Sequence, residues 1–427
     1  MMVATLFLLF AVFLVLGLPL AFAMGLSAIG AIVMGGNQSM LIVPQRMVAS
    51  LDSFALLAVP LFILAGELMN SGGITERIVR FSRSAIGHFK GGLAQANVLS
   101  NMFMAALSGS SLADLSAIGS MMIPAMVREG YRKAYSVAIT ACAALMAPII
   151  PPSIIAVIYG SMTGISIGAL FLAGALPGIM AGFGIMVLAR LMADRGGAKA
   201  MPRESWPDFG RAAGSAMPAL AVPVIIVGGI LSGVFTPTEA GAVAVAYALL
   251  FGVLARRHSP SGIYTLLTNA GVTTAAALIT LAGASLFSYV LVATGFAQAV
   301  LGVMVSITDD PRLAILLIFL VLVILGMFVE TVSALILVVP ILMPVVAFYE
   351  FNGIQFGIFT LMALVLGGLT PPVGILAMVA CRIAGIEYGK TLGMLLPFIL
   401  WWAVATLLVA YVPFLTTWLP SLVFSPR

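Results

Sequence analysis

The chain has 427 residues, of which 62% are hydrophobic and only 8% are charged, and its mean hydropathy is +1.21. Soluble domains carry about a quarter charged residues, so this composition excludes a soluble protein and indicates an all-α polytopic membrane protein. The net charge of +5 does not indicate a nucleic-acid partner, because the basic residues fall in short clusters between apolar runs. The two cysteines, Cys142 and Cys381, lie in apolar segments, which favours packed thiols over a disulfide or a metal site.

The amino-terminal run MMVATLFLLFAVFLVLGLPLAFA is apolar throughout. The first Lys or Arg is Arg46, so this run lacks the basic segment that begins a cleavable signal peptide. We therefore expect it to be a retained membrane span, with the amino terminus on the outer side.

Sixteen of the nineteen Lys and Arg residues fall in five clusters. Basic loops stay on the cytoplasmic side of a membrane, so these clusters are expected to share that side. The three Lys and Arg residues outside these clusters are Arg46, Arg312 and Arg427. The clusters are Arg77, Arg80, Arg83 and Lys90; Arg128, Arg132 and Lys133; Arg190, Arg195, Lys199, Arg203 and Arg211; Arg256 and Arg257; and Arg382 and Lys390.

This constraint orients the first half of the chain. Segment 93–127 has a basic cluster at both ends and SGSS at its centre, which predicts a re-entrant hairpin that opens to the cytoplasm. Segment 135–163 then crosses outward, and segment 168–190 returns.

The second half is threaded in the same way. Segment 218–235 crosses outward and segment 238–255 returns to a basic cluster. Segment 312–345 has acidic residues but no basic cluster at its ends, which predicts a hairpin that enters from the outside. Segment 356–382 then crosses inward and segment 391–412 crosses outward.

Two matched features lie 220 residues apart. Pro151 and Pro152 in APIIPPSI are matched by Pro371 and Pro372 in GLTPPVG, and Pro124 is matched by Pro344 at the same offset. Two halves with one order of parts and opposite threading form an inverted-topology repeat. We therefore predict a first repeat over residues 1–200, with the hairpin at about 93–127 and a broken helix at 135–163. The second repeat covers residues 201–427, with the hairpin at about 312–345 and a broken helix at 356–382.

The Pro-Pro pairs predict breaks within membrane helices. Proline has no amide hydrogen to donate, and non-helical backbone survives in a bilayer only against a cavity or other protein. The hairpin tips SGSSLAD (108–114) and VETVSA (329–334) add hydroxyl groups, freed amides and one carboxylate each. Hydroxyl and carbonyl oxygens suit a small hard cation such as sodium, and half-helix amino termini suit a carboxylate substrate. We expect the tip and the break of each half to face one another.

Asp114 and Glu330 are the carboxylates of these tips. Intramembrane carboxylates are costly and are usually functional, so they could bind a cation, carry a proton or cap a half-helix. Glu239, in TPTEAGA, is expected to be a helix amino-terminal residue.

With these residues in view, the chain resembles the large membrane subunit of the tripartite ATP-independent periplasmic (TRAP) transporters over essentially its whole length. The resemblance is carried by FILAGELMNSGGI (62–74), LSGSSLAD (107–114), APIIPPSI (147–154), LFLAGALPGIM (170–180), GVFTPTEAGAVAVAYAL (233–249) and GLTPPVG (368–374). It implies a multi-pass protein of the bacterial inner membrane, with an elevator-type ion-transporter fold and sodium-coupled uptake of an organic acid such as a C4-dicarboxylate, sugar acid or keto acid. It also implies two partners, a small four-helix membrane subunit and a periplasmic substrate-binding protein.

The resemblance also suggests site residues. Sodium is the coupling ion, and no other cofactor is expected. Relatives often have Asp at the second tip where this chain has Glu330. The sodium candidates are Ser108, Gly109, Ser110, Ser111, Pro151, Glu330, Thr331, Thr370 and Pro371. The candidate substrate contacts are Asp114, Ser153, Ser333 and Gly374.

Three alternatives stay open from the sequence. A proton-coupled carboxylate carrier would use Asp114 or Glu330. A channel is disfavoured because inverted halves around one midplane site suit alternating access. A membrane enzyme is disfavoured because His88 and His258, the only histidines, both lie beside basic loops, where they cannot serve a buried Ser–His pair or zinc site.

Overall fold

A computed structural model describes all residues of the chain except 1, 37, 199 and 425–427. Lys199 and Arg427, which belong to the charge pattern above, lie outside the described residues. The described residues form helices joined by short loops and contain no strand. Eight of these helical segments are long and apolar enough to cross a membrane. The predicted all-α polytopic membrane architecture is confirmed.

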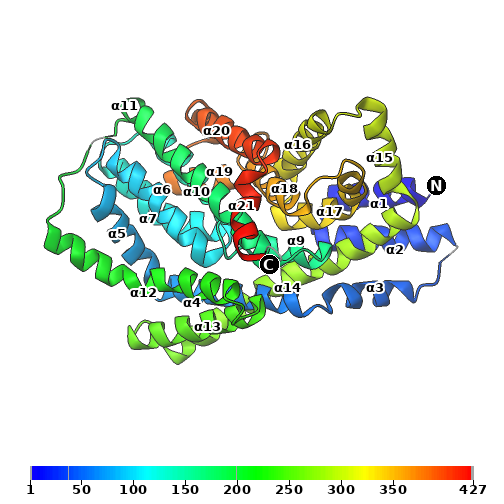
Figure 1. Cartoon of the computed structure of the whole chain (residues 1–427), viewed down its shortest axis with the longest axis horizontal. Coiled ribbons are helices and arrows are strands. Elements are labelled where there is room, and N and C mark those ends of the chain that lie inside the picture. Colours follow the sequence, from blue (N-terminus) through cyan, green and yellow to red (C-terminus); the bar gives the residue numbers. More distant parts are fainter. Residues whose placement is uncertain (1, 37, 199, 425–427) are drawn as a thin grey trace.

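One group of helices, here called the frame, lies along one side of the molecule. In Figure 1 its members α3, α4, α12, α13 and α14 run along the lower edge. The frame comprises α1 (Met2–Val15), α2 (Leu20–Gly35), α3 (Ile42–Leu51), α4 (Ala58–Ser71), α5 (Ile74–Ile86), α12 (Trp206–Leu231), α13 (Pro237–Leu254), α14 (Pro260–Ala293) and α15 (Phe296–Ile307), with the short helix η1 (Phe54–Leu57).

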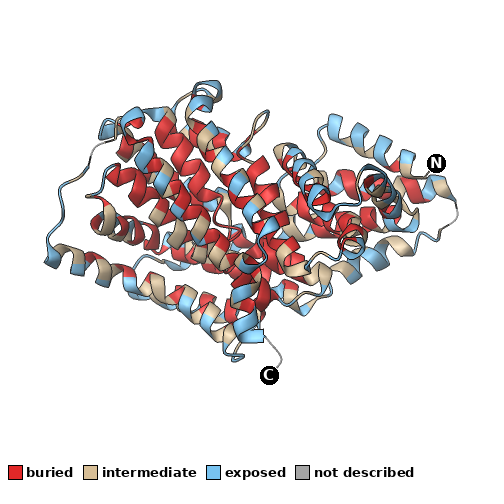
Figure 2. Ribbon diagram, turned by 45° about the horizontal axis from the view of Figure 1, so that its top comes forward, coloured by how far each residue is buried: buried red, intermediate tan, exposed pale blue. Residues whose placement is uncertain are grey.

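The other group, here called the core, holds both hairpins and both breaks. Figure 2 shows that buried residues are concentrated there. The core comprises α6 (Gly92–Ser108), α7 (Ser111–Arg128), α8 (Lys133–Ala144), α9 (Ile154–Thr163), α10 (Ile167–Leu191), α11 (Ala193–Gly196), α16 (Pro311–Phe328), α17 (Thr331–Phe348), α18 (Gly353–Gly367), α19 (Ile375–Ala384), η2 (Tyr388–Thr391), α20 (Leu392–Tyr411) and α21 (Phe414–Phe424).

Helix starts follow local sequence signals. Thr236 caps α13, and Pro237 occupies the first position of the helix. The Glu239 carboxylate accepts a hydrogen bond from the Thr236 amide at 2.8 Å. This reciprocal pairing satisfies two amides that a helix end leaves open. Glu239 is therefore a capping residue, as the sequence predicts. Asp310 and Ser259 also cap helices, α16 and α14, each before a proline and each by accepting one backbone amide.

Both predicted hairpins are present as helical hairpins. The first consists of α6 and α7 and turns at Gly109 and Ser110, and the second consists of α16 and α17 and turns at Val329 and Glu330. Each arm of the second hairpin has 18 residues and is apolar enough to cross a membrane alone. Re-entry of the hairpins into the bilayer therefore stays a prediction.

Both predicted breaks are also present. Segment 135–163 is divided into α8 and α9, and segment 356–382 into α18 and α19. The Pro151–Pro152 and Pro371–Pro372 bonds are both cis. The order hairpin, broken pair, long helix thus occurs twice along the chain. The division into repeats at residues 1–200 and 201–427, and their opposite threading, stay predictions.

The two halves exchange helices. In the frame, α2 packs against α14, whereas α13 packs against α4. Helix α1 likewise reaches α15, where the Phe7 and Phe296 ring centroids are 5.2 Å apart, and α12 packs against α5. In the core, α9 packs against α17 of the second hairpin, and α19 packs against α7 of the first. Each half is therefore completed by elements of the other.

Candidate functional site

The tip of the first hairpin lies directly on the first break. Gly109 ends α6 with φ +63°, a left-handed conformation that side chains disfavour. A Cβ atom at Gly109 would lie 3.0 Å from the Pro152 carbonyl oxygen and 3.2 Å from the Ile154 amide nitrogen. This contact brings Ser108, Gly109, Ser110 and Ser111 next to the Pro-Pro segment, as expected for the first half.

A buried carboxylate, that of Asp114, is hydrogen-bonded to this tip. Ser108 Oγ donates a hydrogen bond to Asp114 Oδ1, and the Ser110 amide donates to Ser108 Oγ at 3.2 Å. Asp114 is only 1% exposed. Its Oδ2 atom has no hydrogen-bond partner among the described residues. Such an oxygen can interact with a cation or hold a proton, because an unpaired charge at this depth is costly. The helix cap itself is Ser110, whose Oγ accepts from the Ala113 amide.

The first break uses some of its own polar groups. Ser153 Oγ donates to the Pro148 carbonyl at 2.6 Å and accepts from the Ala156 amide at 3.1 Å. Ser153 is 1% exposed, and every residue from 141 to 160 is buried. Ser153 therefore shapes the break, and its hydroxyl is already engaged within it.

The second hairpin tip is more open. Glu330 is exposed and caps α17, where its Oε2 accepts from the Ser333 amide at 3.2 Å and from Ser333 Oγ at 3.4 Å. Ser333 is buried at 8% exposure, and Thr331 is half-buried. Of the roles left open for the two tip carboxylates, helix capping therefore applies to Glu330, whereas Asp114 interacts with a serine of the turn.

The second break is held by hydrogen bonds from residues other than the two prolines. The Leu369 carbonyl accepts from Tyr388 Oη at 3.3 Å, and the Gly368 carbonyl accepts from the Leu376 amide at 3.0 Å. Thr370 Oγ1 donates to the Leu366 carbonyl at 2.8 Å. Several carbonyls that the prolines release are thus hydrogen-bonded within the protein. Pro371 remains half-buried.

Two glycines bring the second hairpin and the second break together. A Cβ atom at Gly367 would collide with the backbone of Gly326 and Met327, near the end of α16. Gly374, with φ +57°, begins α19, and a Cβ atom there would lie 2.7 Å from Tyr388 Oη. The structure therefore places a tip beside a break in each half. In the first pair the break is buried and the tip serines are half-buried, whereas the second has Glu330 and Pro372 exposed.

The oxygens at these two pairs come from hydroxyl groups, backbone carbonyls and single carboxylates. No three His, Cys, Asp or Glu side chains come together in the described part of the chain. An ion held at either pair would therefore be coordinated mainly by neutral oxygens, which is an arrangement suited to a small hard cation.

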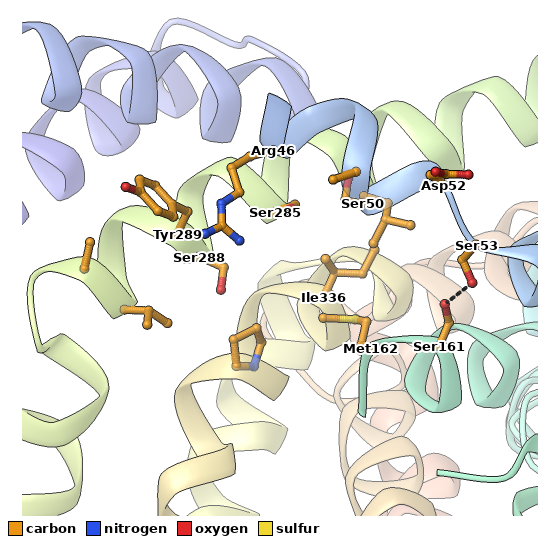
Figure 3. A pocket seen from close by; sticks show the side chains of 15 residues that line it. Arg46, Ser50, Asp52, Ser53, Ser161, Met162, Ser285, Ser288, Tyr289 and Ile336 are labelled. Atoms are coloured by element: carbon orange, nitrogen blue, oxygen red, sulfur yellow. Dashed lines mark hydrogen bonds between the residues drawn. The ribbon is translucent and has the colours of Figure 1, made fainter. Parts of the chain in front are cut away.

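Sequence reasoning missed a cavity of about 610 Å³ between frame and core. It is lined by α3, α14, α9 and α17, and none of the predicted site residues lines it. Figure 3 shows Arg46 reaching into this cavity beside Tyr289 and Ser288. The sequence feature that could have pointed to this cavity is the position of Arg46 outside the basic clusters.

The chain is similar to known transport proteins over nearly its whole length. The family described as "Tripartite ATP-independent periplasmic transporter, DctM component" matches residues 7–415. The chain is 35% identical to the sialic acid TRAP transporter large permease protein SiaM of Vibrio cholerae, covering 95% of each chain. It is 34% identical to the C4-dicarboxylate large permease DctM of Pseudomonas aeruginosa, covering 93% of this chain and 94% of that one.

A solved structure shares the fold. The YdaH transporter of Alcanivorax borkumensis superposes with a TM-score of 0.65 at 13% identity, covering 96% of this chain and 98% of that chain. The relatives are transporter permeases and not enzymes, so the predictions of a transport role and of a multi-pass inner-membrane location are confirmed. The chain belongs to the DctM-component family of the tripartite ATP-independent periplasmic transporters, as a large permease subunit.

Proposed function

We propose that this permease takes up a small organic acid with sodium as the coupling ion, by an elevator movement of the core against the frame. The observation that carries the proposal is that the first hairpin tip contacts the first Pro-Pro break, at Gly109 and Pro152, and that the end of α16 contacts the end of α18, next to the second tip and break, at Gly326 and Gly367. Two related cation sites that flank one substrate site are what an inverted repeat places at the middle of a membrane.

The proposed roles follow the positions of these residues. In the first half, Ser108, Gly109, Ser110, Ser111 and Pro151 would surround one sodium ion. In the second half, Glu330, Thr331, Thr370 and Pro371 would surround another. The substrate carboxylate would lie between the two tips, near Asp114, Ser333 and Gly374, with Ser153 supporting the first break. Helices α7 and α17 begin at these two tips, and helix amino termini favour an anion.

The substrate class is proposed from the relatives. Permeases similar to this chain are named for sialic acid, C4-dicarboxylates and 2,3-diketo-L-gulonate, all of which are organic acids. We propose the same general class here, and as partners the small membrane subunit and the periplasmic binding protein that the tripartite family name implies.

The test is uptake into proteoliposomes that contain this chain with both partners. Labelled N-acetylneuraminate, succinate and 2,3-diketo-L-gulonate are supplied outside, with an inward sodium gradient or with potassium in its place. We expect at least one acid to accumulate only with the sodium gradient. Equal accumulation in potassium would refute sodium coupling, and no accumulation of any acid would count against the organic-acid assignment.

Proton coupling is the second candidate, and the partnerless Oδ2 atom of buried Asp114 favours it. The variant Asp114→Asn separates the two. Under sodium coupling the Asn side-chain oxygen still accepts from Ser108, so uptake falls but persists. Under proton coupling the variant loses the titrating group, so gradient-driven uptake stops while exchange of labelled for unlabelled acid continues.

A further inference from the structure

The cavity between frame and core is built from both groups of helices. Helices α3 and α14 of the frame contribute Arg46, Ser285 and Ser288, and helices α9 and α17 of the core contribute Ser161 and Ile336. Its volume of about 610 Å³ falls within the range of pockets for small molecules, about 300–1,000 Å³. A hydrogen bond between Ser53 Oγ and Ser161 Oγ, 3.1 Å apart, joins the frame side of the cavity to the core side.

Arg46 is the basic residue of this cavity and forms no ion pair with Asp52, which also lines it. Its guanidinium carbon lies 4.6 Å from the centre of the Tyr289 ring, and it forms no salt bridge with any described carboxylate. It is also one of the few basic residues outside the predicted cytoplasmic clusters. A guanidinium group fixed on an aromatic face keeps its fork of donors free for a carboxylate.

Hydroxyl groups surround the guanidinium. Ser288 is 9% exposed and faces the cavity next to Arg46. Ser285 lies one turn earlier on the same face of α14. Neither hydroxyl has a hydrogen bond to another residue within the described ranges, and Ser285 is half-buried. Both therefore have a donor and acceptors available for a bound molecule.

The opposite side of the cavity is polar as well. Asp52 and the Ser53–Ser161 pair lie across from Arg46 in Figure 3. These groups can receive hydroxyl or amide groups of a ligand whose carboxylate lies at Arg46. Serines on both sides and an aspartate fit a hydroxylated small acid better than an acyl chain, which would leave them unpaired.

One wall of the cavity leads toward the second hairpin tip. Ile336 and Pro340 line it from α17, and Ser333 lies three residues before Ile336 and thus on the same helix face. Helix α4 leads to the predicted cytoplasmic cluster that begins at Arg77, and α14 begins after the predicted cytoplasmic pair Arg256 and Arg257. By the same rule, Arg46, which precedes α4, and the far end of α14 are expected on the outer side. A molecule in the cavity would be one helical turn from a residue of the proposed substrate site.

We propose that this cavity is an outer loading site for the transported acid, with Arg46 binding its carboxylate and Ser285 and Ser288 donating hydrogen bonds to it. The proposal rests on the proposed function, since it concerns the same acid before it reaches the hairpin tips. The site is distinct from the tips in its residues, because Arg46 gives it a basic group that neither tip contains.

The first experiment measures the charge preference of the cavity without requiring a known substrate. Ser285→Cys is introduced into the full chain after Cys142→Ala and Cys381→Ala, and the protein is placed in phosphatidylcholine vesicles. The labelling rates of two thiol reagents are compared, a negatively charged sulfonatoethyl methanethiosulfonate and its positively charged trimethylammonium counterpart. We expect Arg46→Gln to lower the ratio of anionic to cationic labelling about tenfold, and Arg46→Lys to restore most of it.

The matched control is Arg312→Gln, which removes another arginine outside the basic clusters and far from this cavity. It should leave the ratio within about twofold. An unchanged ratio in Arg46→Gln, or no labelling of the cysteine by either reagent, would overturn the site. Succinate, N-acetylneuraminate or 2,3-diketo-L-gulonate should slow the labelling. Slowing by phosphatidylglycerol in the vesicles, and by none of these acids, would assign the cavity to a lipid headgroup and overturn the loading role.

The second experiment measures uptake with native Ser285. We expect Arg46→Gln to raise the KM for the acid about tenfold with kcat within about threefold, the pattern for lost binding without lost turnover. An unchanged KM overturns the inference. If the unsubstituted chain shows no uptake at all, the proposed function is overturned, and the labelling experiment alone then decides whether the cavity prefers anions.

Discussion

Gly109 is held by two constraints at once, its positive φ and its approach to the first break. Gly109→Ala adds a Cβ atom in a conformation that costs about 1–2 kcal/mol for an L-residue. The same atom presses on the Pro152 carbonyl at 3.0 Å. We expect a lower melting temperature of the purified protein and a loss of most sodium-driven uptake.

The control for this change is Gly210→Ala. Gly210 lies in helix α12, and a Cβ atom there meets nothing within 4 Å. Alanine in a helix interior is favoured over glycine by roughly 0.5–1 kcal/mol, so this variant should melt at the same or a higher temperature. If both variants behaved alike, the fit between the hairpin tip and the break would not be what constrains Gly109.

The residues of the tips could be predicted from the sequence because their chemistry is local. A carboxylate next to a helix start can cap it, and Glu330 does so at the second tip, whereas the cap at the first tip is Ser110 and not Asp114. The partners of the break were not predictable in this way. Tyr388 reaches Leu369 across 19 residues, and Arg46 meets Tyr289 across an even longer separation. Such contacts depend on how helices are packed, which no local pattern specifies.

At the scale of elements, Gly367 lets α18 approach α16. A Cβ atom at Gly367 would overlap the backbone of Gly326, which cannot move aside as a side chain could. Gly367→Ala should therefore destabilise the protein by about 1–3 kcal/mol, as overpacking does, and should do so most at the second break. Thermal melting with and without sodium would measure the change.

The comparison for Gly367→Ala is Gly271→Ala, at an exposed position of α14 with nothing within 4 Å of the added atom. We expect no loss of stability in that variant. Equal losses in the two proteins would show that helix propensity, and not the contact of α16 with α18, accounts for the effect.

The elements were largely predictable, because apolar runs bounded by charge and by Pro or Gly specify helices and their ends. Segment 93–127 is observed as α6 and α7, and segment 356–382 as α18 and α19. Residues 70–79 (NSGGITERIV) and 293–301 (ATGFAQAVL) are also alike in sequence. In the structure both contain a left-handed glycine, Gly73 and Gly295, between two helices. Helix exchange between the halves was not predictable, since apolar faces alone do not identify their partners.

At the scale of the whole molecule, the hydrogen bond of Ser53 with Ser161 joins the frame to the core. If the core moves as an elevator, tying these residues should stop transport. The double variant Ser53→Cys with Ser161→Cys places two sulfur atoms where oxygens lie 3.1 Å apart, close enough for a disulfide after a small adjustment. We expect oxidation to abolish uptake and reduction to restore it.

The single variants Ser53→Cys and Ser161→Cys provide the control. Each has only one cysteine at this contact, so oxidation should leave its uptake largely intact. Continued uptake by the oxidised Ser53–Ser161 pair would rule out a relative movement of frame and core at this point.

The pairing of α2 with α14 bears on how the protein is synthesised. Helix α2 ends at Gly35, whereas its partner does not begin until Pro260, so the earliest helices leave the ribosome long before α14 exists. Helix α13, in contrast, meets α4, which is already in place. Nascent chains that stop before Ala293 would carry an unmatched helical surface into the bilayer, which makes them natural targets for membrane quality control.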